Sequence, residues 1–202
     1  MQKNKILTAL AVILVLGGLF VFGAVLARAL FYSPQGEISV PESVQQTIDI
    51  PDGELPDRIV IPSIDLDAET QHVGVGKSGN MAVPSNYSDV GWYRLGTVPG
   101  QMGSAVIDGH VDNGFGLSAV FKRLSEMEIG DDVYIITRAG TRLRFEVVEI
   151  VAYPYQDVPL DKVFNRVDAT RLNLITCTGS WLRSDETYDQ RMVVYTKLVE
   201  IE

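Results

Sequence analysis

The one cysteine of the 202-residue chain, Cys177, closes an alternating apolar run over residues 172–176 that predicts a buried strand. Fourteen residues later Arg191 opens a second run, residues 192–195, rich in the β-branched residues that strands favour. His110 follows a glycine at the end of a third apolar run. Pairing of the two later strands would bring the thiol and the guanidinium to one rim of a sheet.

These three residue types suffice for acyl transfer. An imidazole can take the proton of a thiol, and the thiolate is the nucleophilic form. Attack on an amide carbonyl builds an oxyanion that a permanently charged guanidinium can stabilise, and histidine can protonate the leaving amine. Simpler explanations stay open on residue type alone. Free cysteines are most often small buried hydrophobic residues, His110 could cap a turn, and Arg191 could be a solvated charge.

The N-terminal segment predicts a membrane anchor. Residues 6–27 are 22 consecutive uncharged residues, enough to cross a hydrocarbon core of about 30 Å. Lys3 and Lys5 precede them, so the positive-inside rule places the N-terminus in the cytoplasm and the rest outside. A cleaved signal peptide is the alternative, because residues 27–29 resemble a cleavage site. A signal core spans only about 7–15 residues, which favours the retained anchor.

Charge and cysteine content narrow the functional classes. Residues 1–30 hold three of the 17 basic residues and none of the 26 acidic ones, so the remainder has 14 basic against 26 acidic residues, a net charge of −12. Nucleic-acid binding needs a basic face, so this acidic remainder argues against it. A single cysteine cannot form an intramolecular disulfide, and extracytoplasmic proteins generally pair cysteines or avoid them. One retained thiol is therefore suggestive of function.

The composition predicts three parts: a cytoplasmic N-terminus with the anchor over residues 1–30, an extracytoplasmic linker over 31–57, and a folded domain over 58–202 that contains the candidate catalytic residues. The linker carries four prolines and few bulky apolar residues, which is typical of a tether. Within the domain, short extended segments at turn-marked spacing with little helix predict a closed or nearly closed β-barrel. Seven or eight short strands are expected. The candidate strands are 58–62, 66–75, 104–108, 133–137, 142–151, 172–177 and 191–198, with short extended pieces at 81–84 and 90–93.

Three connecting segments complete the prediction. Apolar residues at 117, 120, 121 and 124 have the spacing of a short amphipathic helix. Residues 153–171 are polar and irregular, which predicts a long loop with one helical turn near 161–165. The 13 residues 178–190 are expected to be a second connection, between the strand that ends at the cysteine and the last strand.

The order of motifs is specific where each piece alone is not. The chain carries Gly-His-Val-Asp at 109–112, Leu-Ile-Thr-Cys at 174–177 and Arg-Met-Val-Val-Tyr at 191–195, with softer matches at 91–96, 119–135 and 144–150. In this order, on a small β-domain behind an N-terminal anchor, they resemble the sortases, the membrane-anchored cysteine transpeptidases of bacterial surfaces. The resemblance runs from about Arg58 to Val199. It is closest to class F, with classes D and E as neighbours.

The resemblance implies a mainly β fold, a closed eight-stranded barrel with one or two short helices behind a transmembrane helix. It also implies that Cys177 attacks the Thr–Gly bond of a Leu-Pro-x-Thr-Gly-like sorting signal. His110 would act as the general acid and base, and Arg191 would hold the substrate and the oxyanion. An amine from a peptidoglycan precursor or a pilin lysine would resolve the thioester. The protein would be a single-pass protein of the bacterial cell membrane.

The substrate contacts expected beside the nucleophile are Thr176, Thr178 and Trp181. In the resembled family the loop before the cysteine strand, here 153–171, helps to recognise the signal, and the segment 178–190 would gate access. One departure concerns the family's Thr-Leu-x-Thr-Cys pattern, which begins with Asn173 here, so only Leu174, Thr176 and Cys177 match.

No cofactor or metal is expected. His72 has no second histidine or cysteine near it in the sequence, whereas zinc needs three or four such ligands. Asp112, Asp131 and Asp132 are interpreted as turn and surface residues rather than a calcium site. Two other functions stay open: a tethered cysteine protease that only hydrolyses, and a non-catalytic peptide-binding barrel of the cell envelope. An L,D-transpeptidase would need a Ser-His-Gly-Cys motif, which the sequence around Cys177 lacks.

Overall fold

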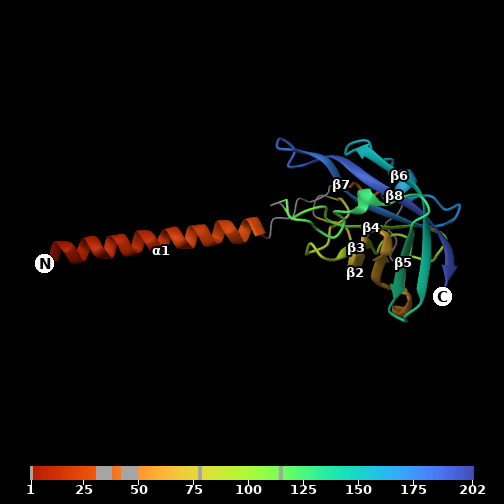
Figure 1. Ribbon diagram of the computed structural model, residues 1–202, viewed down its shortest axis with the longest axis horizontal. Coiled ribbons are helices and arrows are strands. Elements are labelled where there is room, and N and C mark those ends of the chain that lie inside the picture. The colour runs from red at the N-terminus through yellow and green to blue at the C-terminus, as the bar shows by residue number, and fades with distance from the viewer. Residues whose placement is uncertain (1, 31–37, 42–49, 77–78, 114–115) are drawn as a thin grey trace.

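A computed structural model describes residues 2–30, 38–41, 50–76, 79–113 and 116–202, with side chains in the first helix described for residues 10–26. Eight strands form a closed barrel in the order β1-β2-β3-β4-β7-β8-β6-β5, which confirms the predicted mainly β, eight-stranded fold (Figure 1). The strands are β1 (Pro56–Ile61), β2 (Leu66–Val73), β3 (Val90–Tyr93), β4 (Gly103–Asp108), β5 (Asp132–Thr137), β6 (Arg142–Pro154), β7 (Thr170–Leu182) and β8 (Thr187–Ile201). The helices are α1 (Gln2–Leu30), α2 (Leu160–Phe164) and the 3₁₀ turns η2 (Asp52–Glu54), η3 (Pro62–Ile64) and η4 (Leu124–Glu126).

The strands bury side chains on both faces, which produces two apolar clusters. Ile107 and Leu174 belong to the cluster that fills the barrel. Side chains alternate along a strand, so their neighbours Val106 and Ile175 lie on the other face, in a second cluster that we call the outer cluster. The outer cluster comprises Ile38, Val40, Val73, Met81, Tyr93, Val106, Val163, Phe164, Ile175, Val193 and Tyr195.

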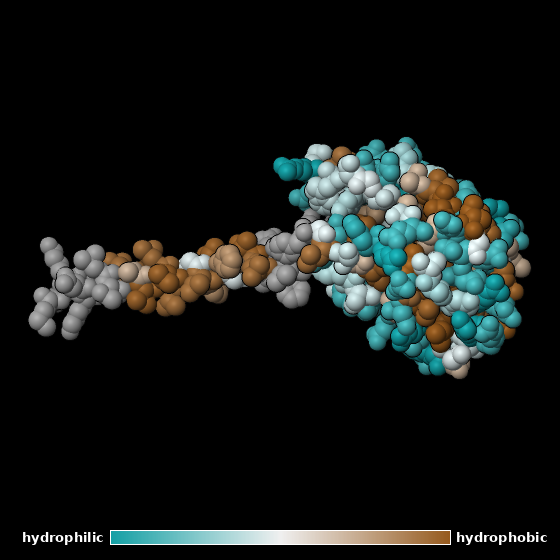
Figure 2. Space-filling view, in the orientation of Figure 1, coloured by the Kyte–Doolittle hydropathy of each residue, from teal (hydrophilic) through white to brown (hydrophobic). Residues whose placement is uncertain are grey.

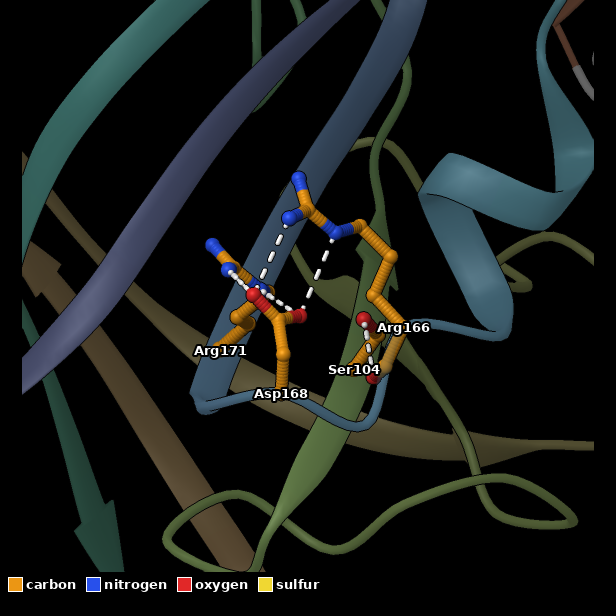
Figure 3. Close-up of polar contacts among 4 residues, drawn as sticks. All are labelled: Ser104, Arg166, Asp168 and Arg171. Carbon is orange, nitrogen blue, oxygen red and sulfur yellow. Dashed lines mark hydrogen bonds and ion pairs between the residues drawn. The ribbon is translucent and has the colours of Figure 1, made fainter.

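The parallel pair β4–β7 fixes the position of the candidate site. Six residue pairs align from Gly103–Thr170 to Asp108–Ile175, so β4 ends beside Ile175 while β7 continues to Leu182. We call the two ends of this paired stretch its amino and carboxyl ends. At the amino ends a polar cluster closes the pair, where Arg166 and Arg171 both bind the carboxylate of Asp168 (Figure 3). The candidate catalytic residues predicted from the sequence lie at the opposite, carboxyl end of the paired stretch. His110 follows β4, and Cys177 lies further along β7, opposite Arg191 on β8.

Helix α1 is a single long rod outside the barrel (Figure 1). Its described side chains are exposed and mostly apolar, as the brown atoms of Figure 2 show. Within the described part of the chain, no helix is both long enough and apolar enough to cross a membrane. The membrane-spanning segment expected over residues 6–27 lies within α1, whose side chains are described for residues 10–26 only.

The expected linker, residues 31–57, lies largely outside the described residues. Its described residues 38–41 contribute to the outer cluster, because Ile38 and Val40 are only 6% and 8% exposed. The Met81 amide donates a hydrogen bond to the Ile38 carbonyl at 3.0 Å. This piece packs as core, where its composition indicated a tether. Strand β1 begins at Pro56, within the segment assigned to the linker.

The helix predicted over residues 117–124 does not form. The structure describes all of these residues, and there the chain makes turns that lead into η4. The apolar pattern does not mark one helical face, because Phe121 is fully buried while Leu117 is 63% exposed. The amides also bond elsewhere than to a helix, since Ala119 donates to the Val111 carbonyl and Phe121 to the His110 carbonyl. The helical turn predicted near 161–165 is present as α2.

The prediction of a 13-residue connection over 178–190 is also wrong. Strands β7 and β8 continue through it as a hairpin, in which Trp181 pairs with Tyr188 and Leu182 with Thr187. The turn itself takes only residues 183–186. Glu186 has a φ of 51°, a left-handed conformation that is uncommon for a residue other than glycine and that the sequence did not signal.

Candidate active site

Cys177 and Arg191 lie directly opposite each other on β7 and β8. This register is the strand pairing that the sequence left as a condition for bringing the two groups together. Directly opposed residues of an antiparallel pair have Cα atoms only about 4.5–5.5 Å apart, so the thiol and the guanidinium share one patch of sheet. Cys177 is a free, partly exposed thiol, whereas Arg191 is only 1% exposed.

The guanidinium of Arg191 is held through its two terminal nitrogens. Nη1 donates to the carbonyls of Tyr188 at 2.9 Å and Gln190 at 3.0 Å, and Nη2 donates to Thr187 Oγ1 at 2.7 Å. The Nε atom is buried and has no hydrogen-bond partner among the described residues. A fixed guanidinium therefore keeps one donor for a ligand. The ring of Tyr155 lies 5.7 Å from its central carbon.

His110 follows β4 and is attached to β7 through Gly109. The Gly109 amide donates to the Ile175 carbonyl at 3.2 Å, and Thr176 Oγ1 donates to the Gly109 carbonyl at 2.7 Å. A Cβ at Gly109 would lie 2.5 Å from Phe121, closer than real Cβ contacts come. Glycine is therefore required at position 109, where the backbone next to His110 packs against Phe121.

Burial and one carbonyl set the protonation of His110. The side chain is buried, its ring lies 5.4 Å from that of Tyr87, and Nε2 is 3.1 Å from the Pro84 carbonyl. A carbonyl only accepts hydrogen bonds, so Nε2 carries the proton and Nδ1 is the position that exchanges one. Burial lowers the pKa of His110, against the opposing effects of Pro84 and Asp112.

The three predicted catalytic residues line one pocket. The space within it and its open mouth measures about 290 Å³. Its lining comprises Ile38, Val83, Asp108, Gly109, His110, Ile175, Thr176, Cys177 and Arg191. The end of β4 and positions within β7 and β8 thus bring together an imidazole, a thiol and a guanidinium that lie far apart in the sequence.

The pocket holds its nucleophile and base mostly uncharged at neutral pH. Burial raises the pKa of the Cys177 thiol, Arg191 opposes that rise, and Asp108 and Asp112 add to it. The pKa of His110 is lowered, so the imidazole is neutral as well. The reactive thiolate–imidazolium pair must therefore form by proton transfer inside the site rather than stand ready in the resting protein.

A second link joins the segment after His110 to β8. The hydroxyl of Tyr188 donates to the carboxylate of Asp112, and burial is the main cause of the raised pKa of Tyr188. The carbonyl of Tyr188 in turn accepts from Arg191. The loop that follows the base and the strand that carries the cation are therefore joined through one tyrosine, which sequence reasoning missed.

The three expected substrate contacts lie at different places. Thr176 lines the pocket, but its hydroxyl is bound to the Gly109 carbonyl. Thr178 is half-buried one residue beyond the nucleophile, and Trp181 is 38% exposed on the hairpin, with its ring 5.4 Å from that of Tyr188. Neither of these two is among the residues that line the pocket.

Sequence reasoning also missed Ile38, Val83 and Asp108. The signal for Asp108 was present, because an acidic residue inside the apolar run 105–108 has to be buried if the run forms a central strand. Ile38 and Val83 gave no such signal.

His72, the second histidine, has a structural role. Its Nε2 donates to the Pro56 carbonyl at 2.8 Å, and its ring packs at right angles to that of Trp92. Among the residues that the structure describes, no group of three or more His, Cys, Asp or Glu side chains could hold a metal ion.

Comparison with known proteins places this geometry in a family. Residues 59–199 match the family model described as the sortase domain. Similar solved structures include sortase A from Corynebacterium diphtheriae, with 23% identity and a TM-score of 0.57 over 73% of this chain and 62% of that one. Sortase C from Streptococcus pneumoniae has 20% identity and a TM-score of 0.56 over 73% and 70%. Sortase C-1 from Actinomyces oris has 23% identity and a TM-score of 0.56 over 79% and 80%.

No curated protein matches the chain. At these identities the solved structures show the shared fold alone, and the chain spans less than two thirds of the Corynebacterium sortase A that it matches. The family model, in contrast, covers well over half of the chain, from within β1 to within β8. By this match the protein belongs to the sortase family.

Proposed function

We propose that the protein is a cysteine transpeptidase of the bacterial surface. It cleaves the Thr–Gly bond of a Leu-Pro-x-Thr-Gly-like sorting signal and transfers the new carboxyl end to an amine of a cell-wall precursor or a pilin lysine. The observation that carries this proposal is the shared pocket of Cys177, His110 and Arg191, with the buried Arg191 Nε free of a hydrogen bond among the described residues. Sortases as a family are cysteine transpeptidases, which supports the same reaction.

The first half-reaction forms a thioester. The Nδ1 atom of His110 takes the proton of Cys177, and the thiolate attacks the threonine carbonyl carbon. Arg191 donates a hydrogen bond to the oxyanion as it forms, which a charged and buried donor does strongly. The carbon–nitrogen bond then breaks, and His110 returns its proton to the leaving glycine amine.

The second half-reaction reverses these roles. The acceptor amine attacks the thioester carbonyl, Arg191 again stabilises the oxyanion, and His110 takes a proton from the amine. The carbon–sulfur bond breaks, and the proton on His110 restores the Cys177 thiol. Water in place of the amine would give hydrolysis by the same steps, so the choice of acceptor depends on what reaches the pocket mouth.

Two finer assignments belong to the proposal. We assign the protein to class F on the Gly-Trp-Tyr sequence at 91–93 and the Gly-His-Val-Asp sequence at 109–112. Thr176 shapes the pocket beside the nucleophile, while Thr178 and Trp181 contact the signal at its rim. The exposed ring of Trp181 on the hairpin supports this rim position.

Intact mass spectrometry tests the reaction. The full chain is incubated with Leu-Pro-x-Thr-Gly peptides, with and without a glycine-based amine, beside the Cys177→Ala variant. The proposal expects a peptide acyl adduct on Cys177 that becomes an amide product when the amine is present. An adduct that yields only acid would replace transpeptidation by proteolysis. No adduct with any peptide, together with a thiol that resists alkylation, would indicate a binding module.

A further inference from the structure

Asp108 is a buried acid in the candidate site that the proposed chemistry does not use. It is the last residue of β4, lines the same pocket as Cys177, and is only 6% exposed. Its Oδ1 atom is buried and has no hydrogen-bond partner among the described residues. Buried polar groups are nearly always paired in folded proteins, so an unpaired carboxyl oxygen beside a nucleophile calls for an explanation.

The surroundings of this carboxyl are apolar. Oδ1 lies 2.5 Å from where a Cβ of Gly91 would stand, and the same point is 3.1 Å from Val73 and 3.2 Å from Pro84. The side chain thus occupies space that Gly91, its partner across β3 and β4, leaves open. Burial raises the pKa of Asp108 well above its ordinary value. Burial in these surroundings therefore favours the neutral carboxyl, the form that can donate a hydrogen bond.

The titratable and charged groups of the pocket surround Asp108 without pairing with it. The strands β7 and β8 contribute Cys177 and Arg191, and the segment after β4 contributes His110. Asp112, outside the pocket lining, adds a further charge near Cys177. The guanidinium of Arg191 makes its hydrogen bonds to residues 187–190. No cation among the described residues therefore holds Asp108 in its charged form.

Elimination leaves Asp108 as the group that can recognise the peptide. Cys177, His110 and Arg191 carry out the chemistry, and the hydroxyl of Thr176 is bound within the protein. The other pocket side chains are the apolar Ile38, Val83 and Ile175. A peptide that enters the pocket loses water from its own polar groups, and each such group needs a new partner.

The register gives the distance between this acid and the nucleophile. Asp108 aligns with Ile175, which precedes Cys177 by two residues on β7. Two residues along a strand and one strand across separate the Cα atoms by about 8 Å, the length of two to three residues of extended peptide. The acid also lies deeper than the partly exposed thiol, whereas the acceptor amine must come from solvent. The acyl half of the peptide is therefore the part that reaches it.

We propose that Asp108 is a specificity-determining residue that donates a hydrogen bond to a neutral acceptor group on a side chain of the sorting signal, one or two residues before the threonine. The proposal rests on the transpeptidase function and deepens it. The signal of this enzyme then carries a polar, uncharged side chain where the rest of the pocket would favour an apolar one. A site built to hydrogen-bond its substrate rejects an analogue that lacks the partner group.

The test compares three variants with wild-type enzyme. Asp108→Leu removes the hydrogen bond, and Asp108→Asn keeps a neutral donor of the same shape. Thr137→Val is the matched control, because Thr137 Oγ1 is also buried without a partner among the described residues but lies on β5, away from the pocket. Rates of Cys177 acylation are measured by mass spectrometry with paired peptides that carry glutamine or leucine at either of the two positions before the threonine. Thermal unfolding is followed in parallel.

Wild-type enzyme should prefer glutamine at one of the two positions by at least about tenfold, as expected for a site that needs a hydrogen-bond partner. Asp108→Asn and Thr137→Val should keep that preference, and Asp108→Leu should lose or reverse it. A purely structural acid would not give this pattern. Asp108→Leu should also unfold at the same or a higher temperature, because replacing an unpaired buried acid by an apolar side chain removes a destabilising group.

The failures of the two proposals are distinct. If no peptide acylates wild-type Cys177, the transpeptidase function is wrong. If wild-type enzyme is acylated and Asp108→Leu shows the same peptide preference, the role of Asp108 is wrong. A wild-type preference for lysine or arginine at these positions would also overturn it, because that would show a charged carboxylate. If Asp108→Leu fails to fold, the Asp108→Asn preference decides alone, and loss of glutamine preference there overturns the role.

Discussion

The two ends of the β4–β7 pair differ in how completely their polar groups are satisfied. At the amino ends, Ser104 donates to the Arg166 carbonyl at 3.1 Å, and Asp168 accepts from Arg166 at 3.0 Å and from Arg171 at 2.6 Å (Figure 3). At the carboxyl ends, Asp108 keeps a buried oxygen without a partner among the described residues. One pair of strands thus has a closed polar network at one end and an open one at the other.

The electrostatic effects at the two ends have opposite signs. Asp168, held chiefly by the hydrogen bond from Arg171, has its pKa lowered to about 2. Asp108 has its pKa raised by burial. The amino end favours the charged form and fits a stabilising role, whereas the carboxyl end tolerates an unfavourable arrangement that only a bound substrate would relieve. Such conflicts with local stability are expected at functional sites.

The largest effect should come from the nucleophile. Cys177→Ala should abolish peptide cleavage, a loss of at least about a thousandfold, because no other group in the pocket can form the acyl intermediate. The fold should remain, since only one small, partly exposed sulfur is removed. Peptide cleavage and thermal unfolding measure the two outcomes. The control at the amino end is Ser104→Ala, which should keep activity; residual transpeptidation by Cys177→Ala would refute the assignment.

The two buried arginines should separate activity from stability. Arg191→Lys should lower kcat by about 10²–10³. The planar guanidinium binds its protein partners through the two Nη atoms and still keeps Nε for the oxyanion, and a single ammonium group cannot do both. Arg171→Lys, at the amino end, should weaken the hydrogen bonds to Asp168 and lower the unfolding temperature with kcat unchanged. Steady-state kinetics and thermal unfolding of both variants provide the comparison. Equal kcat losses would remove the distinction between the two ends.

The sequence predicted the parts of the site that depend on strand periodicity. Alternation located β7 and β8, and their pairing placed Cys177 opposite Arg191, as observed. The position of His110 after an apolar run placed it at a strand end. These predictions succeed because side-chain alternation and strand ends are local properties, and a closed barrel leaves few ways to arrange eight strands.

The parts that failed depend on contacts distant in the chain. Residues 38–41 look like a tether by composition, and only their packing on the outer cluster shows otherwise. The apolar spacing at 117–124 imitates a helix because Phe121 and Leu124 both reach the barrel core. The extension of β7 and β8 through 178–190 depends on pairing between mostly polar residues. Such residues give no apolar alternation from which a strand could be predicted. Asp108 shows its role only after β4 is known to be buried on both faces.

The activity should depend on pH as a broad bell. The reactive site carries one proton shared between Cys177 and His110. On the acid side, protonation of His110 inactivates the site, at a pKa lower than the ordinary value. On the alkaline side, loss of the shared proton inactivates the site, at the raised pKa of Cys177. The acid limb of kcat/KM should therefore lie below pH 6.5 and the alkaline limb above pH 9, the ordinary values of the two groups. Each limb falls about tenfold per pH unit.

Rates measured from pH 5 to 10 check this profile. A narrow optimum between pH 6.5 and 9 would mean that the pKa of His110 is raised and that of Cys177 is lowered, the opposite of what their burial produces. Asp168→Asn should leave the profile unchanged, because its charge lies at the opposite end of the strands. A shifted acid limb in that variant would show that the two ends are electrically coupled.

The smallest effects are in stability, and their signs distinguish the two aspartates. The folded protein holds the Asp168 proton less tightly than the unfolded chain, so its stabilising contribution is present above pH 3.8 and is lost as pH falls toward 2. Asp108 behaves oppositely. Its folded state keeps the proton, so the protein loses stability as pH rises above 3.8 toward the raised pKa. Asp168→Asn should therefore destabilise at neutral pH, and Asp108→Asn should stabilise.

Chemical unfolding of wild type and both variants at a series of pH values measures these differences. The gap between wild type and Asp108→Asn should close below pH 3.8, where the acid is protonated in both states. The gap for Asp168→Asn should be full above pH 3.8, narrow as pH falls below that value and close only below about pH 2. Destabilisation of Asp108→Asn at neutral pH would mean that the carboxylate is paired after all. The carboxyl ends of β4 and β7 would then be as fully satisfied as the amino ends, and the difference that marks the carboxyl ends as the substrate-binding end would disappear.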